Sequence, residues 1–208
     1  MSTRSNRAIE ALAVHEGGWS NHPKDPGGAT MKGVTQRTYD ADNKRRGVPT
    51  RSVKHITDAE VTAIYDGQYW DTIRGDDLPG GLAYCVFDAS VNSGPARAAK
   101  WLQRALGVTQ DGVIGVQTLA ALIGRDLKEV IDQYCDYRLA FMKRLKHWST
   151  FKNGWTRRVA EVRAQSKKWV DGFEVERTVV ATQPKADGPE NLWAAILTFL
   201  SNLFGGRA

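Results

Sequence analysis

The apolar segment from Leu82 to Val91 constrains the fold of this chain more than any other feature. It reads LAYCVFDASV and follows a Pro-Gly-Gly turn, so it has an abrupt start and an almost uninterrupted apolar surface. A helix that is apolar on every side belongs in the interior of a protein. No alternating apolar pattern longer than a few residues occurs along the chain. We therefore predict a mainly α protein, in which a small loop and hairpin lobe lies beside a helical bundle around this central buried helix.

End signals place the helices of the N-terminal half. The first helix is predicted from about Ser5 to His15, where a Gly-Gly pair follows. Residues 28–34 favour a short hairpin. Thr35 can cap a helix that ends near Gly47, because glycine is the usual left-handed residue after a helix. The stretch Thr57-Asp-Ala-Glu60 is a capping box and opens the next helix.

The C-terminal half is predicted to hold the longer helices. Pro95 suits the first turn of the helix that follows the central one. The longest helix is predicted from about Leu127 to Trp148. The last is predicted from Trp155 to Val170, with Gly172 as its stop.

The composition changes after Gly172. Residues 173–190 mix proline, lysine, aspartate and threonine without a helical period, which is typical of a linker. Residues 191–208 form an apolar amphipathic tail whose uncharged stretch is shorter than the roughly 20 residues that span a bilayer. We expect residues 191–204 to contact a membrane surface or another copy, and docking back on the protein is the alternative.

Composition restricts the remaining choices. With 208 residues the chain can bury one good core with a small second lobe. A net charge of +6 favours anionic partners such as an acidic wall polymer, anionic lipid or nucleic acid. The two cysteines, Cys85 and Cys135, are too few for a disulfide framework and are predicted to be buried reduced thiols.

The loop after the first helix carries the reactive side chains. Glu16 stands where that helix should stop, Asp25 lies between prolines, and Thr30 follows a second Gly-Gly pair. So many glycines and prolines around two carboxylates and a hydroxyl indicate a backbone shaped for a ligand. Surface charge is the ordinary interpretation of such residues taken singly.

The positions of Glu16, Asp25 and Thr30 suggest a different catalytic role for the acid than for the other two residues. The negative end of a helix dipole disfavours a charged Glu16, and desolvation by Trp19 would raise its pKa further, as a general acid requires. Asp25 in a polar loop should stay ionised and, with the Thr30 hydroxyl, could polarise a water. Acid, base and water form the inverting arrangement of glycosidases, whose two carboxyl groups stand roughly 6.5–9.5 Å apart.

Ordered motifs resemble a known family. They are Glu16-Gly-Gly-Trp, Asp25-Pro-Gly-Gly-Ala-Thr30-Met-Lys-Gly33-Val-Thr, Tyr69-Trp70-Asp71 and Val86-Phe-Asp88-Ala-Ser-Val-Asn92-Ser-Gly94. Together they resemble glycoside hydrolase family 108, the bacterial and phage N-acetylmuramidases. The Glu–Asp–Thr spacing is also similar to that of phage-type lysozymes, with one residue fewer between Asp and Thr. Later segments resemble the peptidoglycan-binding region that accompanies the family: Trp101-Leu-Gln103, Asp111-Gly-Val-Ile-Gly115 and Asn153-Gly-Trp155.

The resemblance implies an α+β lysozyme-like fold that cleaves the β-1,4 bond between N-acetylmuramic acid and N-acetylglucosamine in bacterial peptidoglycan. Carried over by position, Glu16 is the acid, and Asp25 with Thr30 handles the water; inversion is inferred from the phage-type enzymes. Residues 1–94 would be the catalytic muramidase part. Residues 95–172 would be a helical peptidoglycan-binding part packed in the same lysozyme-like unit.

Four further residues are candidates for substrate binding. Asp88 and Asn92 are four apart on the central helix, so both can face a cleft and bind sugar hydroxyl or acetamido groups. A helix cap with structural hydrogen bonds is the alternative for Asn92. Trp19 and Tyr69 could stack on sugar rings, although aromatic residues at helical spacing more often lie in the core.

No metal or cofactor is expected. His15 and His22 lie near the two carboxylates in sequence, but their spacing matches no zinc pattern. The segment 138–168 is strongly basic. Such a segment is ordinarily a solvated helical face, and the functional alternative is attraction to an anionic wall polymer or lipid. Nucleic acid binding is not expected, because the basic residues follow no recognition-helix pattern.

The leading hypothesis is a peptidoglycan hydrolase for cell-wall degradation or host lysis. A lytic transglycosylase, which needs the acid but no water-activating Asp, and a non-catalytic peptidoglycan-binding protein remain alternatives. The N-terminus has no apolar core of signal-peptide length. We therefore expect a monomer made in the bacterial cytoplasm, which acts on the periplasmic wall after release through holin pores or with a secretion system.

Overall fold

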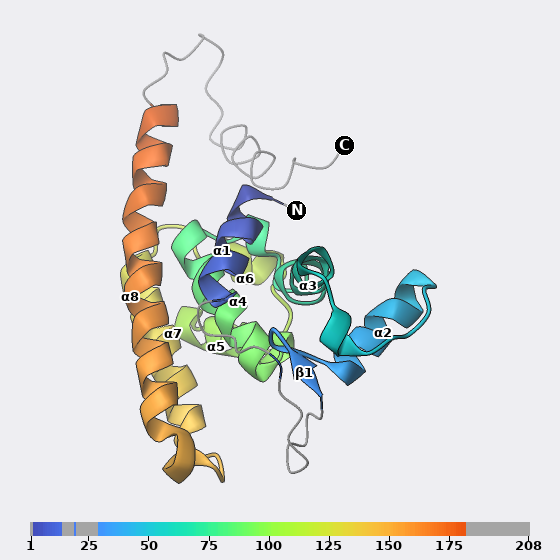
Figure 1. Ribbon diagram of the computed structural model, residues 1–208. Helices are drawn as coiled ribbons and strands as arrows, with labels where there is room; N and C mark the ends of the chain where they lie inside the picture. Colours follow the sequence, from blue (N-terminus) through green and yellow to red (C-terminus); the bar gives the residue numbers. More distant parts are fainter. Residues whose placement is uncertain (1, 14–18, 20–28, 182–208) are drawn as a thin grey trace.

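The computed structural model of the chain describes residues 2–13, 19 and 29–181, with side chains up to residue 170. This part holds eight α-helices and one two-stranded hairpin, which confirms the predicted mainly α fold (Figure 1). The helices are α1 (Thr3–Ala13), α2 (Gln36–Arg46), α3 (Asp58–Tyr65), α4 (Gly80–Ser93), α5 (Pro95–Leu106), α6 (Val116–Ala120), α7 (Leu127–Met142) and α8 (Trp148–Ala181). The strands are β1 (Thr30–Met31) and β2 (Val34–Thr35), and the short helical turns are η1 (Val53–His55), η2 (Asp66–Trp70) and η3 (Gly75–Asp77).

Helix α4 is the buried centre of the molecule, as the apolar segment predicted. Its residues from Gly81 to Ser90 are all buried, and α1, α5, α7 and α8 pack around it. The approach of α8 is close at one point, because a Cβ added to Gly81 would lie 2.1 Å from the carbonyl oxygen of Ser166. Glycine at this position therefore sets the distance between the two helices.

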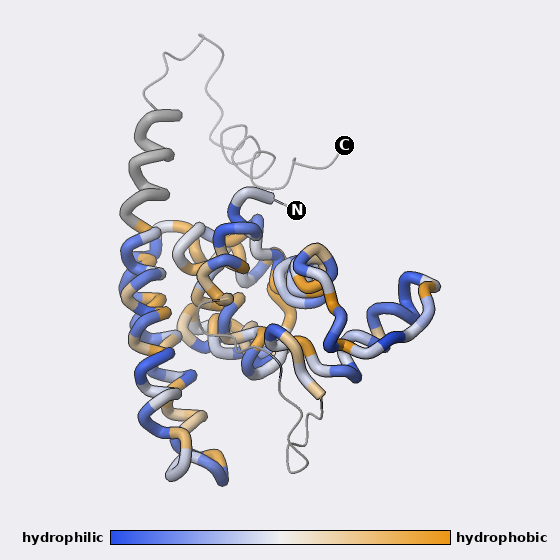
Figure 2. The backbone as a smooth tube through the Cα atoms, viewed as in Figure 1, coloured by the Kyte–Doolittle hydropathy of each residue, from blue (hydrophilic) through white to orange (hydrophobic). Residues whose placement is uncertain are grey.

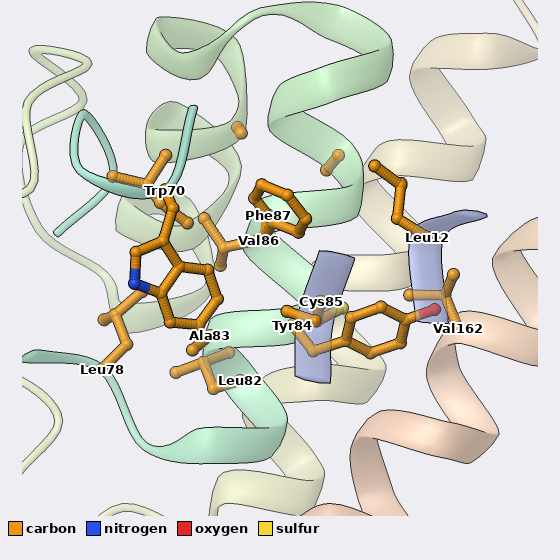
Figure 3. Packing of buried hydrophobic residues seen from close by; sticks show 14 of the residues in the cluster. Leu12, Trp70, Leu78, Leu82, Ala83, Tyr84, Cys85, Val86, Phe87 and Val162 are labelled. Atoms are coloured by element: carbon orange, nitrogen blue, oxygen red, sulfur yellow. The ribbon is translucent and has the colours of Figure 1, made fainter. Parts of the chain in front are cut away.

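A single hydrophobic core joins the early and late parts of the chain. Figure 3 shows Trp70 standing edge-on to Phe87 of α4, with ring centroids 5.5 Å apart. On the other side of α4, Tyr84 packs against Trp169 of α8, with centroids 4.8 Å apart. Hydrophobic residues gather where α4 meets its neighbours, whereas α2 is mostly hydrophilic (Figure 2). Aromatic contacts to both sides of α4 thus make it the common core of the molecule.

The N-terminal elements follow their end signals closely. In the predicted hairpin, Thr30 pairs with Thr35 and Met31 with Val34. The Thr35 side chain caps α2, which ends at Gly47 in the left-handed conformation at φ 68°. The predicted capping box of Thr57 and Glu60 is present at the start of α3. Each of these predictions is confirmed.

The predicted boundary between the last two helices is wrong. Helix α7 ends at Met142 rather than at Trp148, and α8 starts at Trp148 after a short turn. The turn between the two helices lets both residues reach the core: Met142 is buried, and Trp148 packs against the core. Tertiary packing therefore overrides the helical propensity of residues 143–147.

The predicted stop at Gly172 is also wrong. Helix α8 is 34 residues long and continues to Ala181, so residues 173–181 of the predicted linker are helical. A glycine inside a helix costs only about 1 kcal/mol relative to alanine, which contact of α8 with α4 and α7 can outweigh. Residues 182–190 of the linker and the tail 191–208 lie outside the described residues. Within the described part, no helix combines the length and the apolar character needed to cross a membrane.

Candidate functional site

The three predicted catalytic residues differ in what the structure describes. Glu16 and Asp25 lie outside the described residues, so their roles stay predictions. Thr30 is described: it is half-buried and is the first residue of β1. Between Ala13, the last residue of α1, and residue 29, the structure describes Trp19 of the reactive loop.

The hairpin that carries Thr30 is braced by helix α3. Its two central residues, Lys32 and Gly33, have positive φ values of 51° and 75°, which suits a tight turn between two strands. The hydroxyl of Tyr65 donates a hydrogen bond to the carbonyl of Lys32 at 3.1 Å, and the Lys32 ammonium pairs with Asp58. These contacts to α3 fix the hairpin and thereby the backbone of Thr30.

The two predicted aromatic contacts have different surroundings. Trp19 is 42% exposed, and the ammonium of Lys54 lies 5.8 Å from its ring centroid. Tyr69, in the π-helical turn η2, is half-buried and packs against Tyr65 with centroids 5.8 Å apart. Trp19 thus exposes ring surface to solvent, whereas the ring of Tyr69 packs partly against the core. Stacking of either ring on a sugar stays a prediction.

Asp88 is the charged residue of the predicted set that the structure describes, and it is fully buried. Its carboxylate has no exposed surface and accepts hydrogen bonds from two arginines, Arg138 at 2.6 Å and Arg158 at 2.8 and 3.0 Å. Burial alone would raise the pKa of Asp88, but the two guanidinium groups outweigh it and hold that pKa below its ordinary value. Asp88 is therefore ionised and fully engaged with cations.

Asn92 connects this buried cluster to the surface. It is exposed, one turn after Asp88 on α4, and its side-chain oxygen accepts a hydrogen bond from Arg138 at 3.3 Å. The predicted shared face of the two residues is present, with Arg138 lying between them. Substrate binding by Asp88 and Asn92 stays a prediction, since the contacts of both are structural here.

The two arginines were not among the predicted site residues. Arg138 comes from α7 and Arg158 from α8, 50 and 70 positions after Asp88. A signal was available, because an aspartate in an apolar helix must find a cationic partner in the core. The sequence does not say which of its many arginines that partner is.

A second polar cluster orders the loop between α5 and α6. The buried Gln103 amide donates to the Asp111 carboxylate at 2.6 Å and to the Val113 carbonyl at 2.9 Å, and accepts from the Gly112 N–H at 2.9 Å. Hydrogen bonds from Val113 and Gln103 hold the pKa of Asp111 below its usual range. The cluster borders a pocket of about 340 Å³, which is lined by residues that include Gln103, Asp111 and Thr118. The Asp-Gly-Val-Ile-Gly motif is thus a loop built around one buried glutamine.

Among the described residues, no group of three or more His, Cys, Asp and Glu side chains is arranged to hold a metal ion. Cys85 and Cys135 are both buried, and their sulfur atoms lie 3.5 Å apart. The hydrogen bond between them, together with burial, raises the pKa of the Cys85 thiol. A buried thiol with a raised pKa is a poor nucleophile.

Comparison with known proteins places these elements in a family. Residues 9–94 match the family described as glycosyl hydrolase 108, and residues 97–160 match a predicted peptidoglycan domain. The solved structure of SagA from Brucella abortus is similar, with 42% sequence identity and a TM-score of 0.72 over 80% of this chain and 95% of that one. No curated protein matches the chain. The chain therefore belongs to the glycosyl hydrolase 108 family, with a predicted peptidoglycan-binding domain after the catalytic one, and is a glycosidase that acts on peptidoglycan.

Proposed function

We propose that this protein is an N-acetylmuramidase, which hydrolyses the β-1,4 bond between N-acetylmuramic acid and N-acetylglucosamine. One observation carries the proposal: Glu16, Asp25 and Thr30 occur in order within the span that matches glycosyl hydrolase 108. The peptidoglycan-binding domain supplies the matching substrate preference.

Each of the three residues has one task in the proposed reaction. Glu16 donates a proton to the glycosidic oxygen as the bond breaks, which requires a carboxyl group that is protonated near neutral pH. Asp25 accepts a proton from the attacking water, and the Thr30 hydroxyl orients that water. Attack from the face opposite the leaving group inverts the configuration at the anomeric carbon. The braced hairpin supports this role of Thr30, because a water can be held for attack only by a group that is itself held in place.

Variants of the carboxylates test the assignment. Purified peptidoglycan would be incubated with the wild type, Glu16→Gln, Asp25→Asn and the control Glu10→Gln, and the products analysed by mass. Glu10 is an exposed carboxylate on α1, so its loss should leave the rate within about twofold. Loss of a general acid or base should slow release of reducing muramic ends by at least about 100-fold. Undiminished cleavage by Glu16→Gln would refute the proposed acid.

The same products separate the alternatives. Anhydromuramic ends would identify a lytic transglycosylase, and binding without any cleavage would identify a peptidoglycan-binding protein. For localisation, we propose synthesis in the cytoplasm and action on the wall after release. Fractionation of producing cells should then find the protein in the cytoplasm until a pore former is co-expressed, and its appearance in the periplasm without one would contradict that route.

A further inference from the structure

The turn between α7 and α8 forms an exposed projection with an unusual composition. We call residues 143–155 the α7–α8 tip; they comprise the turn and the first two turns of α8. Figure 1 shows the tip at the lower end of the α7–α8 pair. All of its residues are exposed except Trp148 and Trp155, which are half-buried. The segment therefore joins the ends of two helices and holds most of its side chains in solvent.

Aromatic rings form a connected ledge on the tip. Phe151 is 50% exposed and stacks on Trp155, with centroids 5.5 Å apart and 27° between the ring planes. Trp155 in turn lies 6.1 Å from Trp148, and both tryptophans pack against the hydrophobic core. Because the tryptophans pack against the core, the exposed ring of Phe151 stacks on a side chain that the core holds in place.

Basic residues surround this ledge without compensating acids. No aspartate or glutamate occurs from Tyr137 to Ala160. Four exposed cations stand on the tip, and none of them pairs with a carboxylate in the described part of the chain: Lys143, Arg144, Lys146 and Lys152. Farther along α8 the pattern differs, because Arg163 and Lys167 both pair with acids of α7. The tip is thus a local site of uncompensated positive charge.

The tip lies at the same end of α8 as the buried charge cluster. Arg158, which pairs with Asp88, follows Trp155 by less than one helical turn. Through Asp88 and Arg138 the cluster extends to the exposed Asn92. The exposed Asn92 is thus linked through buried side chains to the part of α8 that follows the tip.

We propose that the α7–α8 tip is a peptidoglycan-binding site, with its aromatic ledge against sugar rings and its cations against the carboxylates of the stem peptides. The proposal rests on the proposed function, since it assumes the same polymer as substrate. Stem peptides offer free carboxylates at intervals along a neutral glycan, which matches separate cations around an apolar ledge. A membrane surface fits less well, because the large apolar side chains exposed on the tip are only Leu145 and Phe151, while both tryptophans pack against the core.

Two tip variants and two matched controls test the site in the full chain. The charge variant is Lys143→Gln/Lys146→Gln/Lys152→Gln, and its control removes three exposed lysines elsewhere: Lys44→Gln/Lys100→Gln/Lys168→Gln. Lys168 stands on the same helix, about 24 Å from Lys152. The aromatic variant is Phe151→Ser, and its control is Ile123→Ser, an apolar residue that is 61% exposed off the tip.

Binding would be measured by brief co-sedimentation with insoluble peptidoglycan in the cold. We expect the charge variant to bind about 10-fold more weakly and Phe151→Ser about 5-fold more weakly, with both controls within twofold of the wild type. The effect of the charge variant should vanish on peptidoglycan whose stem-peptide carboxylates have been converted to neutral amides with a carbodiimide and ammonia, while that of Phe151→Ser should persist. Cleavage of short soluble fragments should be unchanged in both control variants, which shows that they are folded.

Other outcomes would overturn the site. Tip variants that sediment like the wild type would refute it, as would losses in the controls of the same size as those on the tip. A loss confined to flotation with phosphatidylglycerol vesicles would assign the tip to a membrane instead. The proposed function fails separately: if the wild type releases no muramic ends while tip variants still bind more weakly, the reaction is wrong and the site stands.

Discussion

Replacing Asp88 with asparagine removes a negative charge from the centre of the molecule and keeps the side chain nearly the same size. In the wild type the carboxylate faces Arg138 and Arg158, whose side chains are 0% and 15% exposed. The variant leaves Arg138 buried without a counter-ion, and its alternative contact is the neutral Asn92 oxygen at 3.3 Å. Breaking a buried ion pair in this way costs about 3–5 kcal/mol.

Urea unfolding measures this loss. With a denaturant slope of about 2 kcal/mol/M, a loss of about 4 kcal/mol lowers the midpoint by about 2 M. The matched control is Asp132→Asn, which removes a carboxylate that pairs with Arg163 and Lys167 on the protein surface. Because solvent screens that pair, its loss should cost less than about 1 kcal/mol.

The difference in the free energy of unfolding between the wild type and Asp88→Asn should also depend on pH. Since the folded state holds the pKa of Asp88 below its ordinary value, ionised Asp88 stabilises the fold at neutral pH. That contribution should fall as the pH drops below about 4 toward the folded-state pKa. A loss no larger than that of Asp132→Asn, or one that is the same at neutral and acidic pH, would refute the structural role of the carboxylate.

Three further predictions concern the frame around the site. Gly81→Ala should lower the free energy of unfolding by about 3 kcal/mol, because the added Cβ would lie 2.1 Å from the Ser166 carbonyl oxygen. The control Gly80→Ala, whose Cβ would have nothing within 4 Å, should change it by less than about 1 kcal/mol. Equal effects of the two variants in urea unfolding would contradict the close helix contact. Partial burial tends to raise the pKa of Glu60, but hydrogen bonds from Thr57, Tyr39 and Arg51 lower it to about 2. Glu60→Ala should therefore cost about 1–2 kcal/mol above about pH 5, and the difference from wild type should shrink as the pH falls toward 2; a difference independent of pH would argue against the ionised cap. The buried thiols of Cys85 and Cys135 should react with a thiol reagent only as fast as the protein unfolds, and labelling at the rate of a free thiol in native buffer would contradict their burial.

Local signals predicted most of the helix starts because they act within a few residues. The Thr35 cap, the Gly47 stop, the capping box and the central position of α4 each depend on a short stretch of sequence. The predictions failed where contacts between segments far apart in the sequence determine the structure. The α7–α8 turn and the continuation of α8 past Gly172 depend on packing against α4 and α7, which no window of local propensity contains.

The candidate site shows the same division. The shared face of Asp88 and Asn92 followed from helical periodicity. Their partner Arg138 did not, because 50 residues separate it from Asp88 and only the fold brings the two together. The hairpin around Thr30 was predictable from its glycines, but its anchor, the Tyr65 hydroxyl on the Lys32 carbonyl, comes from another helix.

In the proposed reaction, water adds to the muramic acid residue when the protein cuts peptidoglycan. The most direct measurement is digestion in water enriched with heavy oxygen, followed by mass spectrometry of the purified products. We expect one heavy oxygen at the new muramic acid reducing end of each product, and none with Glu16→Gln. Heavy oxygen on N-acetylglucosamine ends, or unlabelled anhydromuramic ends, would contradict it.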